Sequence, residues 1–488
     1  MTNKIRSITN PGLRLDILSP EDIDKIHSAT LEILETVGVK FPSEKAMDIF
    51  EANGAKVDRS TSVVKIPAQL VTKALGSAPP EFTLCARNPE LDILLDGNHV
   101  YVGTDGCGVE IIDIGDNQPR RSCLEDVRKI TRIADYLEQV AFNWVPVSAQ
   151  DCPPDSRSLH ELRAIWQNSS KHVQTESIFS AAEAKAAVTM ASALAGGKEA
   201  LRKRPLLSFM VCTISPLSQD KGSLEAALVA AEAGLPVGFM TMASCASTAP
   251  ATLAGNLAVG NAEVLSALAL VQMVYPGAPV FYAAAQTVMD LRTGAYTGGG
   301  PEDFLFGAAT NLLADFYDIP LSMGTFATGA KEPNWQAGIE NSLSTLMASL
   351  TMSDMLVGIG LLNGSLIWSF AQMIMDCEIF DIVAKMMEGI RVDEETLAVD
   401  IIRQVGPGAH FLTQKHTLEQ LRNLWNPSLM DRRPYSEWMN KRDDSRDWAQ
   451  EKARKILETH RPDPLSHDQD KELSNIIESF EKNKDGSF

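Results

Sequence analysis

Short apolar segments alternate with longer amphipathic segments along most of the chain. The apolar segments are rich in Val, Leu, Phe and Met, as buried strands are, and lie at 100–103, 140–147, 173–176, 206–214, 237–242, 280–285, 321–325 and 355–360. The stretches between them read as helices and lie at 123–138, 157–168, 180–196, 218–234, 251–274, 301–317 and 335–352. Strands that alternate with helices indicate parallel βαβ units, and a count near eight favours a closed (β/α)8 TIM barrel, an α/β fold.

The two ends of the chain show different patterns. Residues 1–80 predict an N-terminal helical cap, in which Ser19 is the N-cap of the first helix and Pro20 occupies its first turn. Residues 81–365 contain the predicted barrel. Residues 366–488 predict a C-terminal helical extension, packed on the barrel, with a polar tail.

Composition excludes several classes of function. The net charge is −19 and no Lys/Arg cluster is evident, which argues against a nucleic-acid partner and a membrane surface. The first residues lack the apolar centre of a signal peptide, and the apolar run 352–371 is interrupted by Asp354 and Asn363, so we interpret it as strand and loop. Seven scattered cysteines without a Cys-x-x-Cys motif suit a reducing cytoplasm. We expect a cytoplasmic homo-oligomer.

The sequence gives little support for metal or covalent chemistry. Eight histidines form no His-x-x-x-His or His-x-Cys pair, so we expect no directly bound metal. No Gly-x-Gly-x-x-Gly motif opens a helix after a strand, and no Ser-His-Asp or Cys-His order stands out. We assign no catalytic group beyond residues that position a substrate.

Aromatic residues near the ends of the predicted strands are the first binding candidates, because the carboxyl ends of barrel strands form the usual site edge. A quaternary ammonium cannot donate hydrogen bonds and is held by aromatic faces. The candidates for such a cage are Trp144, Tyr282, Phe326 and Trp335. The alternative for each is packing beneath a helix.

Polar residues at similar positions complete the candidate set. Glu176 would complement a cation or form a salt bridge, and Gln286 directly follows the sixth strand. Arg292 would pair with a carboxylate in a bidentate way or brace the following glycine loop. Lys331 and Glu332 lie in the loop after the seventh strand. A buried Lys331 would form a Schiff base, whereas a surface lysine is the commoner case.

Several segments resemble one family. GGGPEDFLFGAATNLLADFYDIP, GAKEPNWQAGIE, GPGAHFLTQKHT and the opening SPEDIDKIHSATLEILETVGVKF are similar to segments of the trimethylamine methyltransferase superfamily. The resemblance implies a (β/α)8 barrel that passes a methyl group from a methylated amine to a cob(I)alamin-type cofactor. That cobalamin rides on a separate corrinoid protein, which docks over the barrel mouth.

One departure from the family pattern bears on the substrate. The archaeal trimethylamine enzymes carry pyrrolysine in the loop that matches roughly 330–334, where this chain has only standard residues. The non-pyrrolysine relatives are similar to enzymes that demethylate quaternary amines, so the resemblance implies glycine betaine as the best single substrate. Proline betaine, carnitine and a tertiary methylamine stay open. The rivals from other classes are a non-catalytic betaine- or corrinoid-binding barrel and a lyase that uses Lys331.

Overall fold

Eight parallel strands close into a barrel in the computed structural model, which describes residues 4–9, 12–106, 108–116 and 118–483. The strands, in spatial order, are β7 (His99–Gly103), β10 (Val140–Trp144), β11 (His172–Thr175), β12 (Leu207–Cys212), β13 (Val237–Thr241), β15 (Val280–Ala284), β17 (Leu321–Gly324) and β18 (Met355–Val357). Pairing of β18 with β7 closes the ring. The predicted (β/α)8 fold is therefore confirmed.

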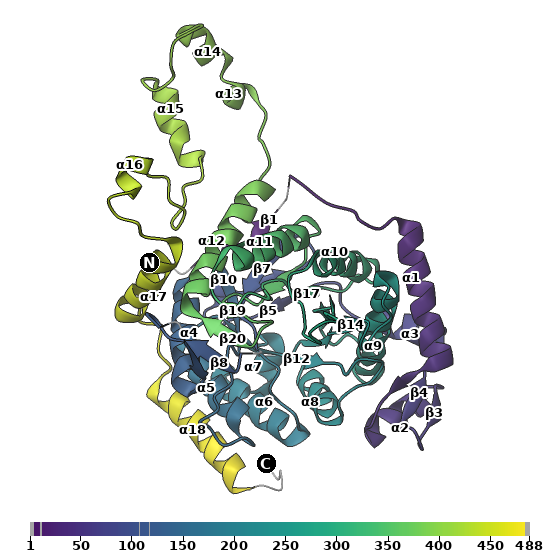
Figure 1. Cartoon of the computed structure of the whole chain (residues 1–488). Coiled ribbons are helices and arrows are strands. Elements are labelled where there is room, and N and C mark those ends of the chain that lie inside the picture. The colour runs from purple at the N-terminus through teal and green to yellow at the C-terminus, as the bar shows by residue number, and fades with distance from the viewer. Residues whose placement is uncertain (1–3, 10–11, 107, 117, 484–488) are drawn as a thin grey trace.

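Helices surround this barrel, as Figure 1 shows. They are α4 (Leu124–Tyr136), α5 (Arg157–Asn168), α6 (Ala181–Ala195), α7 (Lys198–Lys203), α8 (Lys221–Glu232), α9 (Leu253–Val274), α10 (Pro301–Phe316), α11 (Trp335–Leu350) and α12 (Phe370–Met387). All but α7 and α12 fall in the predicted stretches between strands, and α12 lies in the predicted C-terminal helical extension. The helix α9 is long and apolar enough to cross a membrane by composition alone, but 89% of its most apolar window is buried in this fold.

Aromatic rings fill the barrel interior. A Cβ on Gly103 would lie 2.3 Å from the ring of Phe142, and a Cβ on Gly238 would lie 2.1 Å from the ring of Phe281. Glycine at these positions therefore gives the rings room between the strands. The hairpin of β5 (Phe82–Leu84) and β6 (Ile93–Leu95) lies near the N-terminal ends of the strands, with Phe82 and Phe281 ring centroids 6.4 Å apart.

Two small sheets extend the barrel beyond the C-terminal ends of its strands. The first contains β19 (Leu361–Leu362), β20 (Ile367–Ser369), β8 (Glu110–Ile112) and β9 (Pro119–Arg121), in that order. It joins the loops that follow β18 and β7. The second pairs β14 (Ser244–Cys245) with β16 (Thr287–Val288). The loops that form the barrel mouth are therefore ordered by backbone hydrogen bonds.

Most of the N-terminal segment packs on the outside of α9, whereas β1 (Ile8–Thr9) pairs with β7. The part beside α9 consists of α1 (Pro20–Glu32), the π-helix η1 (Ile33–Val37), β2 (Val39–Lys40), α2 (Glu44–Ala52), β3 (Lys56–Asp58), β4 (Val63–Lys65) and α3 (Ala68–Leu75). The 3-10 helix η2 (Pro89–Leu91) lies further along the chain, between β5 and β6. Ser19 caps α1 and forms a capping box with Asp22, as its position predicts. The segment also contains the three-stranded sheet β2–β4–β3, which the helical pattern did not indicate. The division at residues 80 and 365 stays a prediction.

The C-terminal part divides into an outer layer and a projecting arm. The helices α17 (Ser445–Thr459) and α18 (His467–Lys482) pack on α12, α4, α5 and α6. The other elements are α13 (Glu394–Leu397), α14 (Val399–Val405), α15 (Lys415–Gln420), η3 (Leu421–Asn423) and α16 (Tyr435–Trp438). The first four of these form the arm, which extends to one side of the barrel (Figure 1).

Two glycine substitutions test the packed interior. Gly238→Ala places a methyl group against the Phe281 ring and should destabilise the fold by about 1–3 kcal/mol through overpacking. Gly338→Ala in α11 meets no atom within 4 Å and should be neutral or stabilising by up to about 1 kcal/mol. Denaturant unfolding midpoints measure both. Equal midpoints for the two variants would contradict the filled interior.

Candidate active site

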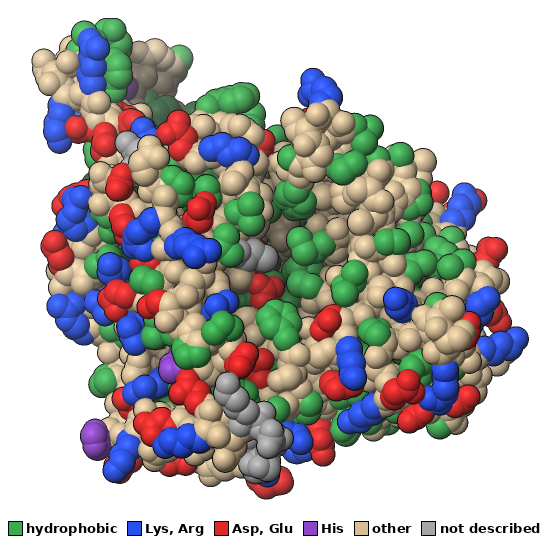
Figure 2. Space-filling view, turned by 60° about the horizontal axis from the view of Figure 1, so that its bottom comes forward, with side chains coloured by type: hydrophobic (Ala, Val, Ile, Leu, Met, Phe, Trp, Pro, Cys, Tyr) green, Lys and Arg blue, Asp and Glu red, His purple; other side chains and the backbone are tan. Residues whose placement is uncertain are grey.

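A cavity of about 1290 Å³ opens at the C-terminal ends of β7, β10, β11 and β12. The loops after these strands form its walls, and Phe480 and Glu481 near the end of α18 form part of its rim. Figure 2 shows the molecule hollowed in the middle of the face in view, with acidic and hydrophobic side chains around the hollow. The cavity therefore lies at the edge of the barrel where parallel strands present their loops.

Trp144 and Glu176 lie side by side at the C-terminal ends of the strands, where Glu176 lines the cavity and Trp144 is fully buried. Trp144 ends β10 in register with Gln174 of β11, and Glu176 follows Gln174 by two residues, so the three side chains point to the same side of the sheet. A Cβ on Gly106 would lie 2.4 Å from Glu176 Oε1 and 2.5 Å from Trp144 Nε1. The Nε1–H of Trp144 is buried and has no hydrogen-bond partner among the described residues.

Cys212 lies beside Glu176 at the end of β12. Its Sγ is 3.9 Å from Glu176 Oε2. Burial, together with the carboxylates of Glu176 and Asp105, raises the pKa of the Cys212 thiol well above its ordinary value. The thiol is therefore protonated at neutral pH and lacks the thiolate that a nucleophile needs.

Two more carboxyl groups line the side of the cavity that faces the helices. Burial raises the pKa of Glu161 in α5 to about 7, although the Ala149 N–H at 2.8 Å and the Ser177 hydroxyl at 3.0 Å donate to it. Burial also raises the pKa of Glu183 in α6, which accepts a hydrogen bond from the Phe179 N–H at 3.0 Å. Burial therefore favours the neutral, protonated forms of both carboxyl groups.

Arg157 at the start of α5 is the only cationic side chain among the described residues that line the cavity. Its Nη1 donates to Ser148 Oγ at 3.4 Å, and its Nε is buried without a hydrogen-bond partner in the part of the chain that the structure describes. Both oxygens of the neighbouring Glu161 already accept other hydrogen bonds. The guanidinium thus has donors that a ligand carboxylate would satisfy.

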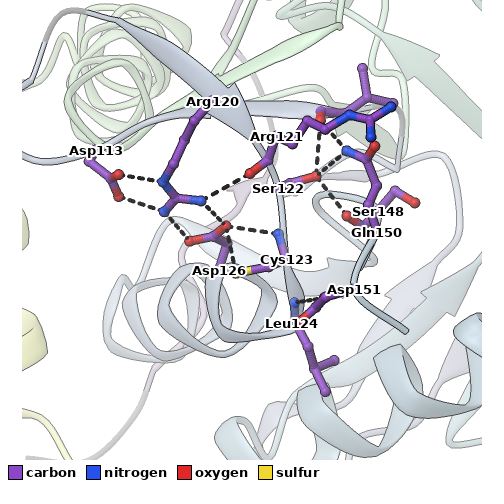
Figure 3. Close-up of polar contacts among 11 residues, drawn as sticks. Asp113, Arg120, Arg121, Ser122, Cys123, Leu124, Asp126, Ser148, Gln150 and Asp151 are labelled. Carbon is purple, nitrogen blue, oxygen red and sulfur yellow. Dashed lines mark hydrogen bonds and ion pairs between the residues drawn. The ribbon is translucent and has the colours of Figure 1, made fainter. Parts of the chain in front are cut away.

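A polar network holds the loop that carries Ser148 (Figure 3). Arg120 bridges two carboxylates, with Nε 2.5 Å from Asp113 and Nη1 2.8 Å from Asp126. The Ser122 hydroxyl then donates to the Ser148 carbonyl at 2.6 Å. These contacts join β9 and α4 to the loop after β10. They therefore hold Ser148, whose hydroxyl accepts the hydrogen bond from Arg157.

Comparison with known proteins identifies the family. The family described as trimethylamine methyltransferase (MTTB) matches residues 1–484. The chain belongs to this family. Trimethylamine methyltransferase MttB of Desulfitobacterium hafniense (strain DSM 10664 / DCB-2) is 36% identical over 473 residues, covering 96% of this chain and 95% of the relative. Glycine betaine methyltransferase of Desulfitobacterium hafniense (strain Y51) is 34% identical over 467 residues, covering 95% and 97%.

Solved structures support the fold of this methyltransferase family member. The monomethylamine methyltransferase MtmB of Methanosarcina barkeri matches with a TM-score of 0.51 at 14% identity, covering 90% of this chain and 93% of that structure. At this identity the likeness concerns the fold alone. The family assignment rests on the sequence match over nearly the whole chain.

Three of the sequence-predicted site residues are buried away from the cavity wall. Tyr282 follows Phe281 in β15, so its side chain points to the opposite face of the sheet. It is fully buried near Tyr317. Phe326 is also fully buried and does not line the cavity. Both ends of the Gln286 side-chain amide are hydrogen-bonded within the protein. Its Nε2 donates to Asn256 Oδ1 at 2.8 Å, and its Oε1 accepts from Thr310 Oγ1 at 3.0 Å.

Four other predicted residues lie on the surface of the molecule. The side chain of Arg292 is 91% exposed and pairs only loosely with Asp290, at 3.6 Å. Lys331 Nζ donates to the Gly329 carbonyl at 2.6 Å, and Glu332 pairs with Arg446 of α17 at 3.2 Å. Trp335 is 79% exposed at the start of α11. Of the nine predicted residues, Glu176 alone lines the cavity, and Trp144 lies buried beside it.

Three residues that line the cavity carry no signal in the aromatic and polar pattern of the sequence: Arg157, Glu161 and Phe179. Phe179 follows β11 and presents an exposed ring at the cavity. Position relative to the predicted strands could have indicated all three, because each lies in or directly after a loop that follows β10 or β11. Among the described residues, no group of three or more His, Cys, Asp or Glu side chains could hold a metal ion.

Stability should depend on the protonation of Glu161. Its pKa is about 7 in the folded protein against an ordinary value of 4.5, so its contribution to stability is complete below about pH 4.5 and is lost as pH rises to about 7. The melting temperature of Glu161→Gln should therefore fall less over this range than that of the wild type. Calorimetry measures this, with the exposed Glu458→Gln as control. Equal slopes for wild type and Glu161→Gln would rule out the raised pKa.

Proposed function

We propose that this protein transfers a methyl group from a small betaine, with glycine betaine as the first candidate, to a corrinoid carried by a partner protein. One observation carries the proposal: a single cavity at the barrel mouth is lined by the Glu176 carboxylate, by the exposed Phe179 ring and by the Arg157 guanidinium, whose Nε–H has no partner among the described residues. A betaine has the complementary pair of charges. The 34% identity to a glycine betaine methyltransferase supports the same substrate.

The ammonium end of the substrate would lie at Glu176 and Trp144. A quaternary nitrogen offers no hydrogen bond, so its binding depends on the Glu176 charge and on aromatic faces. Phe179 at the cavity edge can supply a second ring. The carboxyl groups of Glu161 and Glu183 also line the cavity, and burial favours their neutral forms, so Glu176 is the carboxylate that we assign to the ammonium group.

The carboxylate end would lie at Arg157. Its buried Nε–H has no protein acceptor among the described residues, and a carboxylate placed there would accept from Nε and from one Nη in the bidentate geometry that guanidinium favours. Arg157 thereby replaces Arg292 as the proposed partner of the carboxylate. The two charges of the substrate would then fix its orientation in the cavity.

The cavity is also large enough for the transfer. Its volume of about 1290 Å³ exceeds the roughly 300–1,000 Å³ of ordinary ligand pockets, so a betaine leaves room for part of a larger group. A corrinoid, when a partner protein brings it to the mouth, would supply the nucleophile in its cob(I) state. The chain's own residues hold the substrate and exclude water around the reacting methyl group.

No side chain needs to donate a proton in this reaction. When the N–CH3 bond breaks, its electron pair stays on nitrogen and leaves a neutral tertiary amine. The protein then acts by positioning, which supplies up to about 7–11 kcal/mol of a barrier in favourable cases. The protonated Cys212 thiol is compatible with this mechanism, because the corrinoid supplies the nucleophile and no cysteine thiolate is needed.

The test of this function is a direct assay with several substrates. The protein is incubated with free cob(I)alamin and glycine betaine, and dimethylglycine is measured by mass spectrometry. Carnitine, proline betaine and trimethylamine are run in parallel. Turnover of another betaine alone would reassign the substrate, and binding without any product would leave a non-catalytic barrel. Covalent trapping at Lys331 with borohydride and a carbonyl substrate would instead indicate a lyase.

Two arginine variants separate the site from its surroundings. Arg157→Ala should raise the KM for glycine betaine roughly 10- to 100-fold, because a hydrogen bond to a charged group is worth about 1.5–3 kcal/mol. Its effect on binding of tetramethylammonium, which has no carboxylate, should be small. Arg292→Ala, a change in an exposed loop, is the matched control and should leave the KM unchanged. A raised KM for Arg292→Ala with an unchanged KM for Arg157→Ala would instead indicate that Arg292 binds the substrate carboxylate.

A further inference from the structure

The arm, residues 390–427, has no core of its own. Not one of its residues is buried, and none of α13, α14, α15 and η3 exceeds seven residues. Isolated helices shorter than about 12–15 residues are marginal in water, so packing elsewhere must stabilise these. Within one chain the barrel does not provide that packing.

Apolar side chains of the arm face solvent. Seven of them are between 54% and 91% exposed: Ile390, Val392, Leu397, Val399, Leu412, Leu418 and Leu424. Green side chains are visible on the protrusion at the upper left of Figure 2. Exposed apolar surface gathered on one segment marks an interaction site. The arm contains 38 residues, more than the roughly 20–30 residues that each side of a standard protein interface uses.

A second uncovered apolar surface lies on α11. Trp335, Ile339 and Leu343 recur every four residues and are all exposed. They occupy the side of α11 opposite its buried residues, such as Asn341 and Ala348, so they point away from the barrel. One chain thus carries both a projecting apolar arm and an uncovered apolar stripe.

We propose that the arm packs on a second copy of this chain, and that the α11 stripe (Trp335, Ile339 and Leu343) is part of the surface it covers. Because each chain carries both the arm and the α11 stripe, each of two copies can place its arm on the stripe of the other, which gives a closed assembly. The arm carries four Lys/Arg and five Asp/Glu, so it contributes only one unit of the net charge of −19. It can therefore approach another acidic copy with little added repulsion.

The root of the arm favours a second copy over the corrinoid partner. The helix α12 ends at Met387, whose carbonyl accepts from the Gly12 N–H at 2.8 Å. The neighbouring β1 pairs with the first residues of β7, with Ile8 opposite Val100, so this point lies at the end of the barrel away from the mouth. A partner that delivers a cofactor to the mouth would meet the other end.

Analytical ultracentrifugation of the full chain tests the proposal. The wild type should sediment as a multiple of 53.1 kDa, and Leu412→Asp/Leu418→Asp/Leu424→Asp should sediment at 53.1 kDa with an unchanged melting temperature. Val37→Asp, at an exposed valine of the N-terminal segment, is the control and should keep the wild-type mass. A monomeric wild type, or an arm variant that keeps the full mass, would overturn the proposal.

A second variant tests the acceptor surface. Ile339→Asp/Leu343→Asp should also yield the monomer, and mixing Leu412→Cys with Ile339→Cys chains should give a cross-linked pair under mild oxidation. Failure of both results would remove α11 from the interface. If the arm variant keeps its mass but loses binding to the corrinoid protein, the arm contacts that partner and the assembly proposal is wrong. None of these outcomes depends on which amine is the substrate.

Discussion

Closure of the sheet through the β18–β7 pairing is the constraint on which the rest of the structure depends. Once eight parallel strands form a ring, all their carboxyl ends face one side, and the loops that follow them must surround a common space. Aromatic rings admitted by Gly103 and Gly238 help to fill the space inside the barrel. The cavity therefore lies above the filled interior, where chain segments distant in sequence meet.

The fold could be predicted because its signals are local. The strands are short apolar runs, and helices such as α4 and α5 repeat their apolar positions at helical spacing. The helix α9 is instead apolar almost all round and was indicated by its length. The three-stranded sheet near residues 39–65 could not be predicted in the same way, because its strands contain only two or three residues each. The arm was correctly expected to be helical, but its detachment from the barrel depends on tertiary packing.

The candidate site could be predicted only in part, for a geometric reason. Adjacent strand residues point to opposite faces, so an error of one residue moves a side chain from the barrel interior to the helix layer. Tyr282 and Phe281 show this difference. Trp144 and Glu176 point to the same side of the sheet and lie beside each other, and Glu176 reaches the cavity. Loops offer no such rule, and the exposure of Arg292 depends on a turn that no periodic pattern encodes.

The position of α18 has a practical consequence for work with this protein. Phe480 and Glu481 place the carboxyl-terminal part of the chain at the rim of the cavity, whereas β1 anchors Ile8 and Thr9 at the other end of the barrel. An affinity tag or fluorescent fusion joined after the last residue would lie close to the entrance of this cavity. A label joined ahead of the first residue leaves that entrance clear, and is the better choice for pull-down and turnover measurements.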